Sequence, residues 1–214
     1  FFYHFMTTSN HRPYTFPTNR IDLPTGSREA AVKYTDWAIG DFITQAKQHA
    51  WFDNTVFVFI ADHCADGAGA RNLDARRHHI PLLIYSPKHI AAKQMDGLAS
   101  QIDLAPTLLG LLNFNYESHF FGHDMLRSTA SEERALIGNY QHLGLLQGNR
   151  LLYLKPRKGA GLIREPLGAK PLEAGLSAED ETLRKQTIAY YQAADVVNAQ
   201  HLTKWQPPQQ SHRD

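Results

Sequence analysis

The sequence predicts an α/β fold in which a mainly parallel sheet is flanked by helices. Short runs that are apolar on both faces, at 55–61 and 80–87, alternate with stretches of helical spacing at 28–49 and 100–113. This alternation is typical of α/β domains, and strands buried on both faces are typical of parallel sheets. After about residue 134, short strands with Gly-Asn turns predict a small antiparallel meander, and a terminal helix follows it.

The first 49 residues predict a strand, a loop and a helix. Residues 1–6 (FFYHFM) are aromatic and apolar and indicate a buried strand, whereas 7–27 contains Pro, Gly, Asn and Thr throughout and indicates a long loop. Loops of this length inside a domain are often functional. In 28–49, alanines and aromatic residues recur at three- and four-residue spacing, and Ser27 precedes them as a helix cap. Because Phe1 lies directly within an apolar strand, we expect the chain to be a fragment of a longer polypeptide.

The later elements follow the same rules. The strand at 55–61 leads into a loop at 62–78 that is first rich in glycine and then basic. Pro106 fits the first turn of the helix at 100–113. Ser177, which is followed by acidic residues, begins the terminal helix.

We divide the chain into three parts on this basis. Residues 1–134 form the α/β part, and 135–206 form a closing subdomain of antiparallel strands plus a helix. Residues 207–214, rich in Pro and Gln, form a tail.

Composition excludes several classes of protein. The 214 residues carry a formal net charge of +1, so no overall charge favours a nucleic-acid partner, and we expect none. The single cysteine cannot form an internal disulfide, and no apolar run is long enough to span a membrane. Twelve histidines are many, and histidine is the commonest metal ligand.

Asp62 and His63 are the first candidate site. They follow the strand at 55–61, and ligands of open α/β sheets bind outside the carboxyl ends of the strands. A carboxylate beside an imidazole is a suitable ligand pair for Zn²⁺, Mn²⁺ or Mg²⁺, and the lack of a thiolate cluster disfavours structural zinc. In the alternative interpretation, Asp62 caps the loop and His63 lies on the surface. Cys64 is more typical of a small buried residue than of a ligand or nucleophile.

His11 and Arg12 are the second candidate site. They lie where the first strand gives way to the long loop, and Pro13 favours an extended backbone at Arg12. Both side chains can donate hydrogen bonds to an anion, and arginine can do so with two parallel bonds. The alternative is a solvated loop.

Three further motifs carry charged residues. The basic residues 76–79 precede a strand and form either a solvated turn or a loop that offers charge to an anionic substrate. Asp103 is expected to cap the helix that follows it. His123 and Asp124 are expected to form a tight turn.

Taken in order, six motifs resemble the carboxyl-terminal half of a sulfatase-like catalytic domain. They are TSNHRPYTFP, YTDWAIGDFI, DNTVFVFIADHCADGAG, HHIPLLIYSP, QIDLAPTLLGLL and FFGHDML. The resemblance covers about residues 1–130 and is closest to the lipoteichoic-acid-synthase and phosphoglycerol-transferase branch of the alkaline phosphatase superfamily. The combined order is specific, whereas IDLAPTLL or DH alone is not.

The resemblance implies roles for the candidate residues. Asp62 and His63 would be ligands of the catalytic divalent ion, often manganese in this family, with Zn²⁺ or Mg²⁺ as alternatives. His11, with Arg12, would contact the phosphate of the substrate. The family's threonine nucleophile and a carboxylate ligand lie upstream of the Asn-His-x-Pro loop, and no segment here matches them. We therefore expect no catalytic nucleophile in this chain and expect the missing N-terminal half of the domain to supply it.

The resemblance also implies a reaction and a location. The parent enzyme would move phosphoglycerol from a phospholipid donor to a glycan or polyol acceptor. It would be anchored in the cell inner membrane with its catalytic domain in the periplasm or outside the cell, and this fragment itself would be soluble. One alternative is a sulfatase or phosphoethanolamine transferase, and another is a non-catalytic phosphate- or glycan-binding domain. An upstream threonine favours transfer, an upstream Cys or Ser favours sulfate-ester hydrolysis, and neither favours binding alone.

Overall fold

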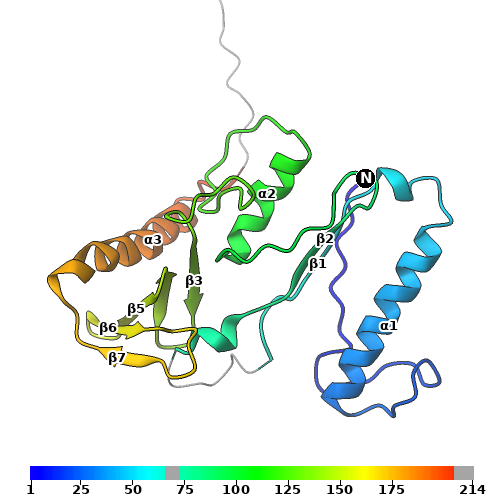
Figure 1. Ribbon diagram of the computed structural model, residues 1–214, viewed down its shortest axis with the longest axis horizontal. Helices are drawn as coiled ribbons and strands as arrows, with labels where there is room; N and C mark the ends of the chain where they lie inside the picture. The colour runs from blue at the N-terminus through cyan, green and yellow to red at the C-terminus, as the bar shows by residue number, and fades with distance from the viewer. Residues whose placement is uncertain (66–72, 205–214) are drawn as a thin grey trace, which may run out of the picture. The chain divides into compact units, whose positions relative to one another are not determined.

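The computed structural model describes residues 1–65 and 73–204 (Figure 1). Within them the chain forms two compact units. The first unit consists of Phe1–Phe59 and Leu83–Lys93, and the second of Ile60–Leu82 and the chain from Gln94 onward. Within the described residues, no helix has both the length and the hydropathy needed to cross a bilayer.

The first unit is built on the helix α1, Arg28–Ala46, as the spacing of its apolar residues predicts. The Ser27 hydroxyl accepts a hydrogen bond from the Ala30 N–H at 3.2 Å and so caps the helix, which confirms the predicted start. The last residue of α1 packs against Phe52, in the short 3₁₀ turn η1 (Phe52–Asn54), and against Phe57. These aromatic contacts form the core of the unit.

The strands β1 (Phe57–Ile60) and β2 (Leu82–Tyr85) form a two-stranded sheet. The N–H of Ala61, after β1, donates to the carbonyl of Pro81, before β2, at 3.3 Å. At the other end, the Ser86 hydroxyl donates to the carbonyl of Thr55 at 2.9 Å. The two strands are therefore antiparallel. The α/β class is confirmed, but the expected parallel direction is not observed here, because an apolar run indicates burial and carries no information on strand direction.

Residues 1–6 do not form the expected buried strand. They belong to neither sheet, and the five apolar side chains among them are 73–88% exposed. Aromatic and apolar composition indicates a preference for burial, but a strand also needs a neighbour to pair with its backbone. Among the described residues no strand supplies that pairing.

The second unit contains the predicted antiparallel meander, which is confirmed. Five strands pair in the order in which they follow each other along the chain, and each pair is antiparallel. Their bounds are β3 Arg134–Gly138, β4 Leu143–Gln147, β5 Arg150–Lys155, β6 Gly159–Arg164 and β7 Leu172–Ala174.

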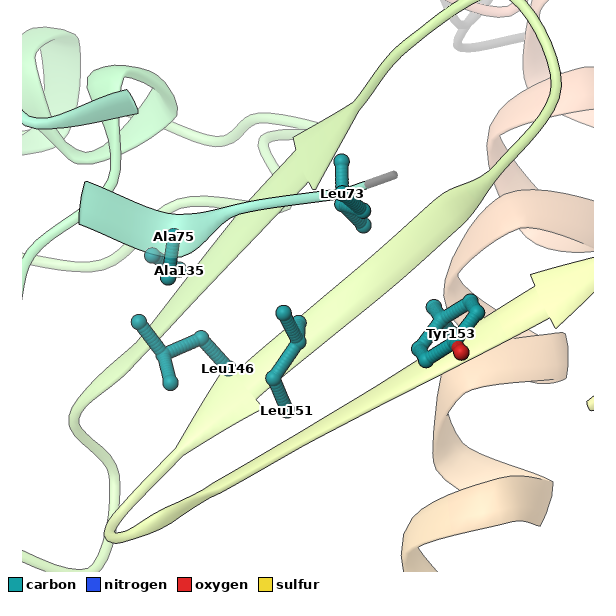
Figure 2. Packing of buried hydrophobic residues seen from close by; sticks show 6 residues of the cluster. All are labelled: Leu73, Ala75, Ala135, Leu146, Leu151 and Tyr153. Atoms are coloured by element: carbon teal, nitrogen blue, oxygen red, sulfur yellow. The ribbon is translucent and has the colours of Figure 1, made fainter. Parts of the chain in front are cut away.

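Both faces of this sheet are covered. One face packs on α3, Glu181–Ala199, through leucines that include Leu152 and Leu183. The other face packs on the segment that enters the 3₁₀ turn η2, Ala75–His78. Figure 2 shows the six residues of that second cluster: Leu73, Ala75, Ala135, Leu146, Leu151 and Tyr153. Successive residues of a strand point to opposite faces, which is why Leu151 and Leu152 belong to different clusters.

Helix α3 begins as the sequence predicts. Ser177 and Asp180 form a reciprocal capping box around the 3₁₀ turn η4, Ala178–Asp180, which leads into α3. A second capping box, of Ser100 and Asp103, surrounds η3, Gln101–Asp103, which leads into α2, Leu104–Leu111. Asp103 does take part in capping, but as the N3 partner of Ser100, and its side chain makes no cap hydrogen bond to α2 itself.

Asp103 also forms a buried ion pair with Arg134 of β3. The two guanidinium nitrogens donate to the two carboxylate oxygens at 2.9 and 3.0 Å, and the side chains are 1% and 2% exposed. The carboxylate accepts two more hydrogen bonds, from the N–H groups of Ser100 and His123. One carboxylate thus joins η3, the turn at His123 and the first strand of the sheet.

Removing one partner of this pair should destabilise the second unit strongly. Asp103→Asn leaves the buried guanidinium of Arg134 without its counter-charge, so the free energy of unfolding should fall by about 3–5 kcal/mol. Urea unfolding followed by circular dichroism measures it. The matched control is Asp53→Asn, because Asp53 pairs with Lys88 at 3.3 Å on the surface and should contribute at most about 1 kcal/mol. Equal losses in the two variants would contradict the structural role of the buried pair.

A second prediction concerns high pH. The Tyr191 hydroxyl of α3 donates to the carbonyls of Ile137 and Gly144 at 3.1 and 2.9 Å, and burial raises the pKa of this phenol to about 12. The unfolded phenol titrates near about 10, so the unfolded state loses its proton first. The stability that Tyr191 contributes should be complete below about pH 10 and be lost as the pH rises toward 12.

Tyr191→Phe isolates this effect. The difference in unfolding free energy between the wild type and Tyr191→Phe should shrink by about 2 kcal/mol between pH 9 and 12. Urea unfolding at a series of pH values measures the difference. A difference that stays constant over this range would show that the hydroxyl is not held in its neutral form.

Candidate functional site

The segment that carries Asp62 and His63 leaves β1 and is held by its backbone. The side-chain amide of Gln101 donates to the carbonyls of Ala61 and Asp62 at 3.0 and 3.1 Å. On the other side, the N–H of Ala61 donates to Pro81. The backbone that presents the two side chains is therefore fixed from η3 and from the entry to β2.

The His63 ring has a defined proton arrangement. Its Nδ1 lies 2.9 Å from the carbonyl oxygen of Cys64, and a carbonyl oxygen can only accept, so Nδ1 carries the proton. Nε2 of the neutral ring then presents its lone pair, which is the form in which histidine binds a metal. This Nε2 lies 3.4 Å from Oδ2 of Asp62, while Oδ1 accepts the N–H of His63 at 2.9 Å. Two acceptors thus face each other, and a cation between them would satisfy both.

The pair fits a divalent metal ion. With metal–ligand bonds of about 2.0–2.2 Å, a nitrogen–oxygen separation of 3.4 Å corresponds to a ligand–metal–ligand angle of about 110°, close to tetrahedral. The side chains of His63 and Asp62 are 73% and 79% exposed, so further ligands have access. Within residues 1–65 and 73–204, no group of three or more His, Cys, Asp or Glu side chains is arranged to hold a metal. The described residues thus offer two adjacent donor groups here, fewer than a metal ion needs.

Cys64 contributes through its backbone. Its carbonyl fixes the His63 ring, while its thiol is free and half-buried. Of the glycine-rich exit after Cys64, residues 66–72 lie outside the described chain.

His11 and Arg12 lie in the first unit, in a loop closed by its own backbone. The N–H of His11 donates to Thr8, that of Tyr14 to His11, and that of Gly26 to Tyr14, at 2.8–3.1 Å. Tyr14 has a φ of 63°, in the left-handed region that non-glycine residues rarely adopt. The loop therefore folds back until Tyr14 reaches the residues that begin α1. Nδ1 of His11 lies 2.8 Å from the carbonyl of Arg12, which leaves Nε2 facing outward on an exposed residue.

This closure brings two arginines to one phenol. Arg12 and Arg28 both hydrogen-bond the Tyr14 hydroxyl and hold its pKa below the usual range for tyrosine. Two guanidinium groups thus meet at one phenol of the loop that carries His11, and guanidinium groups suit a phosphate. Tyr14 and Arg28 were not identified from the sequence. The sequence marks Arg28 only as the first residue after the Ser27 cap. Its approach to the loop of His11 depends on how that loop folds back, which the sequence does not show.

Two of the basic residues 76–79, Arg76 and His78, form structural contacts. Arg76 donates to the Asp74 carboxylate at 2.8 and 3.0 Å, and His78 contacts the carbonyls of Asp74 and Gly138 through its two ring nitrogens. Asp124 accepts the N–H of Leu126 within a turn, as the sequence predicts for that motif. These contacts connect η2 to the sheet of the second unit.

Comparison with known proteins identifies the family to which these motifs belong. The family model described as Sulfatase matches residues 1–114, more than half of the chain. Lipoteichoic acid synthase 2 of Bacillus subtilis is 26% identical over 160 residues, which are 64% of this chain and 24% of that protein. Phosphoglycerol transferase I of Xanthomonas campestris is 28% identical over 125 residues, 57% of this chain and 18% of that protein. The chain thus spans a quarter or less of the curated relatives that it matches.

Solved structures agree on the fold. A protein of the alkaline phosphatase superfamily from Vibrio parahaemolyticus matches with a TM-score of 0.85 and 28% identity, over 94% of this chain and 49% of that one. The structure described as Ps i-CgsB, at 20% identity, matches with a TM-score of 0.55 over 78% of this chain and 42% of that one, which supports the fold alone. The motif order, the α/β fold and the family match lead to one conclusion: the chain belongs to the sulfatase family.

Proposed function

We propose that the chain is part of a metal-dependent phosphoglycerol transferase that moves phosphoglycerol from a phospholipid to a glycan or polyol acceptor. The observation that carries the proposal is the Asp62–His63 pair, in which a lone pair of the ring faces a carboxylate oxygen at 3.4 Å. The names of the relatives, a lipoteichoic acid synthase and a phosphoglycerol transferase, support the choice of the transferred group. The proposal includes a parent enzyme at the inner membrane with its catalytic domain outside the cytoplasm.

In this proposal the residues of the chain have separate tasks. Asp62 and His63 hold a divalent ion, for which Mn²⁺ is the first candidate and Zn²⁺ and Mg²⁺ the others. When bound, the ion lowers the pKa of the attacking hydroxyl and stabilises charge on the phosphoryl oxygens. In its doubly protonated form, His11 donates from Nε2 to the phosphate while Nδ1–H stays bonded to the Arg12 carbonyl, and Arg12 and Arg28 supply positive charge to the phosphate.

The nucleophile is a threonine that precedes Phe1 in the complete enzyme. Its oxygen bonds to phosphorus as the bond to the lipid oxygen breaks, and an acceptor hydroxyl then displaces the threonine. The remaining metal ligands come from the same N-terminal half. In this arrangement residues 1–214 bind and orient the phosphate but do not attack it.

The metal assignment predicts the composition of the complete enzyme. Asp62→Ala/His63→Ala removes two ligands, so metal affinity should fall by more than about a hundredfold and the purified variant should lose its bound ion. Elemental analysis after dialysis measures the metal per chain. The matched control is Asp195→Ala/His201→Ala, which removes an exposed Asp and an exposed His near the end of α3. Stoichiometric metal in the Asp62/His63 variant would sink the ligand assignment.

The phosphate assignment predicts a kinetic loss. His11→Ala removes a hydrogen bond to a charged group, so kcat/KM for transfer from phosphatidylglycerol should fall by about 10- to 100-fold. Arg28→Ala should lower kcat/KM in the same direction, because it removes one of the two charges gathered at Tyr14. The control is His4→Ala, an exposed histidine outside the loop. Wild-type kcat/KM in His11→Ala would remove His11 from the phosphate site.

A further inference from the structure

Two turns lie side by side at one end of the five-stranded sheet. The turn between β3 and β4 contains Tyr140, and the turn between β5 and β6 contains Arg157 and Lys158. Leu143 and Leu154, the residues nearest these turns on neighbouring strands, are register partners. The antiparallel order therefore brings both turns to the same end of the strands. We call Tyr140, Lys155, Arg157 and Lys158 the basic end of the sheet.

The basic end carries three positive charges without compensation. Lys155, Arg157 and Lys158 are all exposed, and none of them forms an ion pair within the part of the chain that the structure describes. Lys155 lies over the ring of Tyr153 at 5.1 Å, which fixes its stem on the sheet. Neither turn contains an acidic residue.

The backbone at these cations is strained. Arg157 and Lys158 have φ values of 60° and 61°, and the N–H of Gly159 donates to the carbonyl of Pro156. Both residues therefore lie in the left-handed region, where Gly and Asn are favoured over residues with long side chains. Two cations thus occupy positions where fold stability favours other residues. Strain of this kind is a reason to look for a functional role.

The neighbouring turn carries an exposed aromatic residue, Tyr140, on a hydrogen-bonded backbone. The side-chain oxygen of Asn139 accepts the N–H groups of Gln141 and His142 at 3.0 and 2.9 Å. Tyr140, between them, is 87% exposed. A solvent-exposed tyrosine beside cations has the chemistry of residues at a membrane–water interface.

We propose that the basic end of the sheet docks on the surface of a bilayer that contains anionic phospholipid. Lysine and arginine are attracted to anionic headgroups, and the tyrosine ring inserts at the headgroup level. A soluble polyanion would bind the cations but leave the Tyr140 ring in water. The exposed ring therefore favours a bilayer surface over a soluble polyanion as the partner. The proposal rests on the proposed function only in that a phospholipid donor requires such a surface nearby.

Vesicle binding tests the proposal without catalysis. The purified chain, in EDTA and at about 0.1 M salt, should co-sediment with vesicles of phosphatidylglycerol and phosphatidylcholine but not with phosphatidylcholine alone. Arg157→Asn/Lys158→Gly should lower the partition coefficient by about thirtyfold, because each cation near an anionic surface contributes about a factor of five. The same variant should melt at the wild-type temperature or above, since Asn-Gly relieves the backbone. A loss of binding therefore cannot come from a loss of folding.

The control removes the same charge elsewhere. Lys170→Gln/Lys185→Gln lies in the connection before β7 and at the start of α3, and it should keep wild-type binding. Tyr140→Ser should weaken binding while keeping its salt dependence. Equal losses in the two charge variants, no binding by the wild type, or binding to soluble polyphosphate that equals binding to vesicles would each overturn the proposal. Because EDTA removes the ion, the result is independent of the Asp62–His63 assignment.

Discussion

The second unit depends on one buried carboxylate. Asp103 is 1% exposed and accepts two hydrogen bonds from Arg134 and one each from the backbones of Ser100 and His123. Burying a charge is costly unless it is paired and fully hydrogen-bonded, and this carboxylate meets both conditions. The same four bonds fix η3, the turn before His123 and the first strand of the sheet relative to one another. Asp103, a member of the capping box, therefore also connects three segments of the second unit.

That junction reaches the candidate metal ligands through one side chain. Gln101 lies two residues before Asp103 in η3, and its amide donates to the carbonyls of Ala61 and Asp62. Whatever fixes η3 therefore fixes the backbone from which Asp62 and His63 project. Catalytic geometry requires positioning to well under 1 Å, which exposed side chains at a strand end do not achieve alone. The buried ion pair supplies a rigid support at a distance from the chemistry.

Local signals in the sequence predicted local structure well. Ser27, Ser177 and Asp103 were identified as helix caps, and a cap is decided within three or four residues of chain. The position of Asp62 and His63 at a strand end was likewise readable from the run before them. The direction of the strands and the lack of a pairing strand for residues 1–6 could not be predicted. Both depend on which distant segment of the chain lies beside them. The pairing of Arg12 with Arg28 around Tyr14 was missed for the same reason, since 15 residues of loop separate the two arginines.

The rings of the two candidate histidines, His11 and His63, are each held by a local hydrogen bond. In each, Nδ1 is held by the carbonyl of the next residue, at 2.9 Å for His63 and 2.8 Å for His11. In each ring Nδ1–H is thus occupied and Nε2 is free. At His63 the lone pair of the neutral ring faces Asp62 and suits a metal, whereas at His11 the doubly protonated ring would donate from Nε2 to a phosphate oxygen. The chemical role of each ring is therefore decided by its charged neighbours, while its proton arrangement is decided by the backbone. The contribution of Cys64 to this arrangement is its backbone carbonyl, and its thiol takes no part in it.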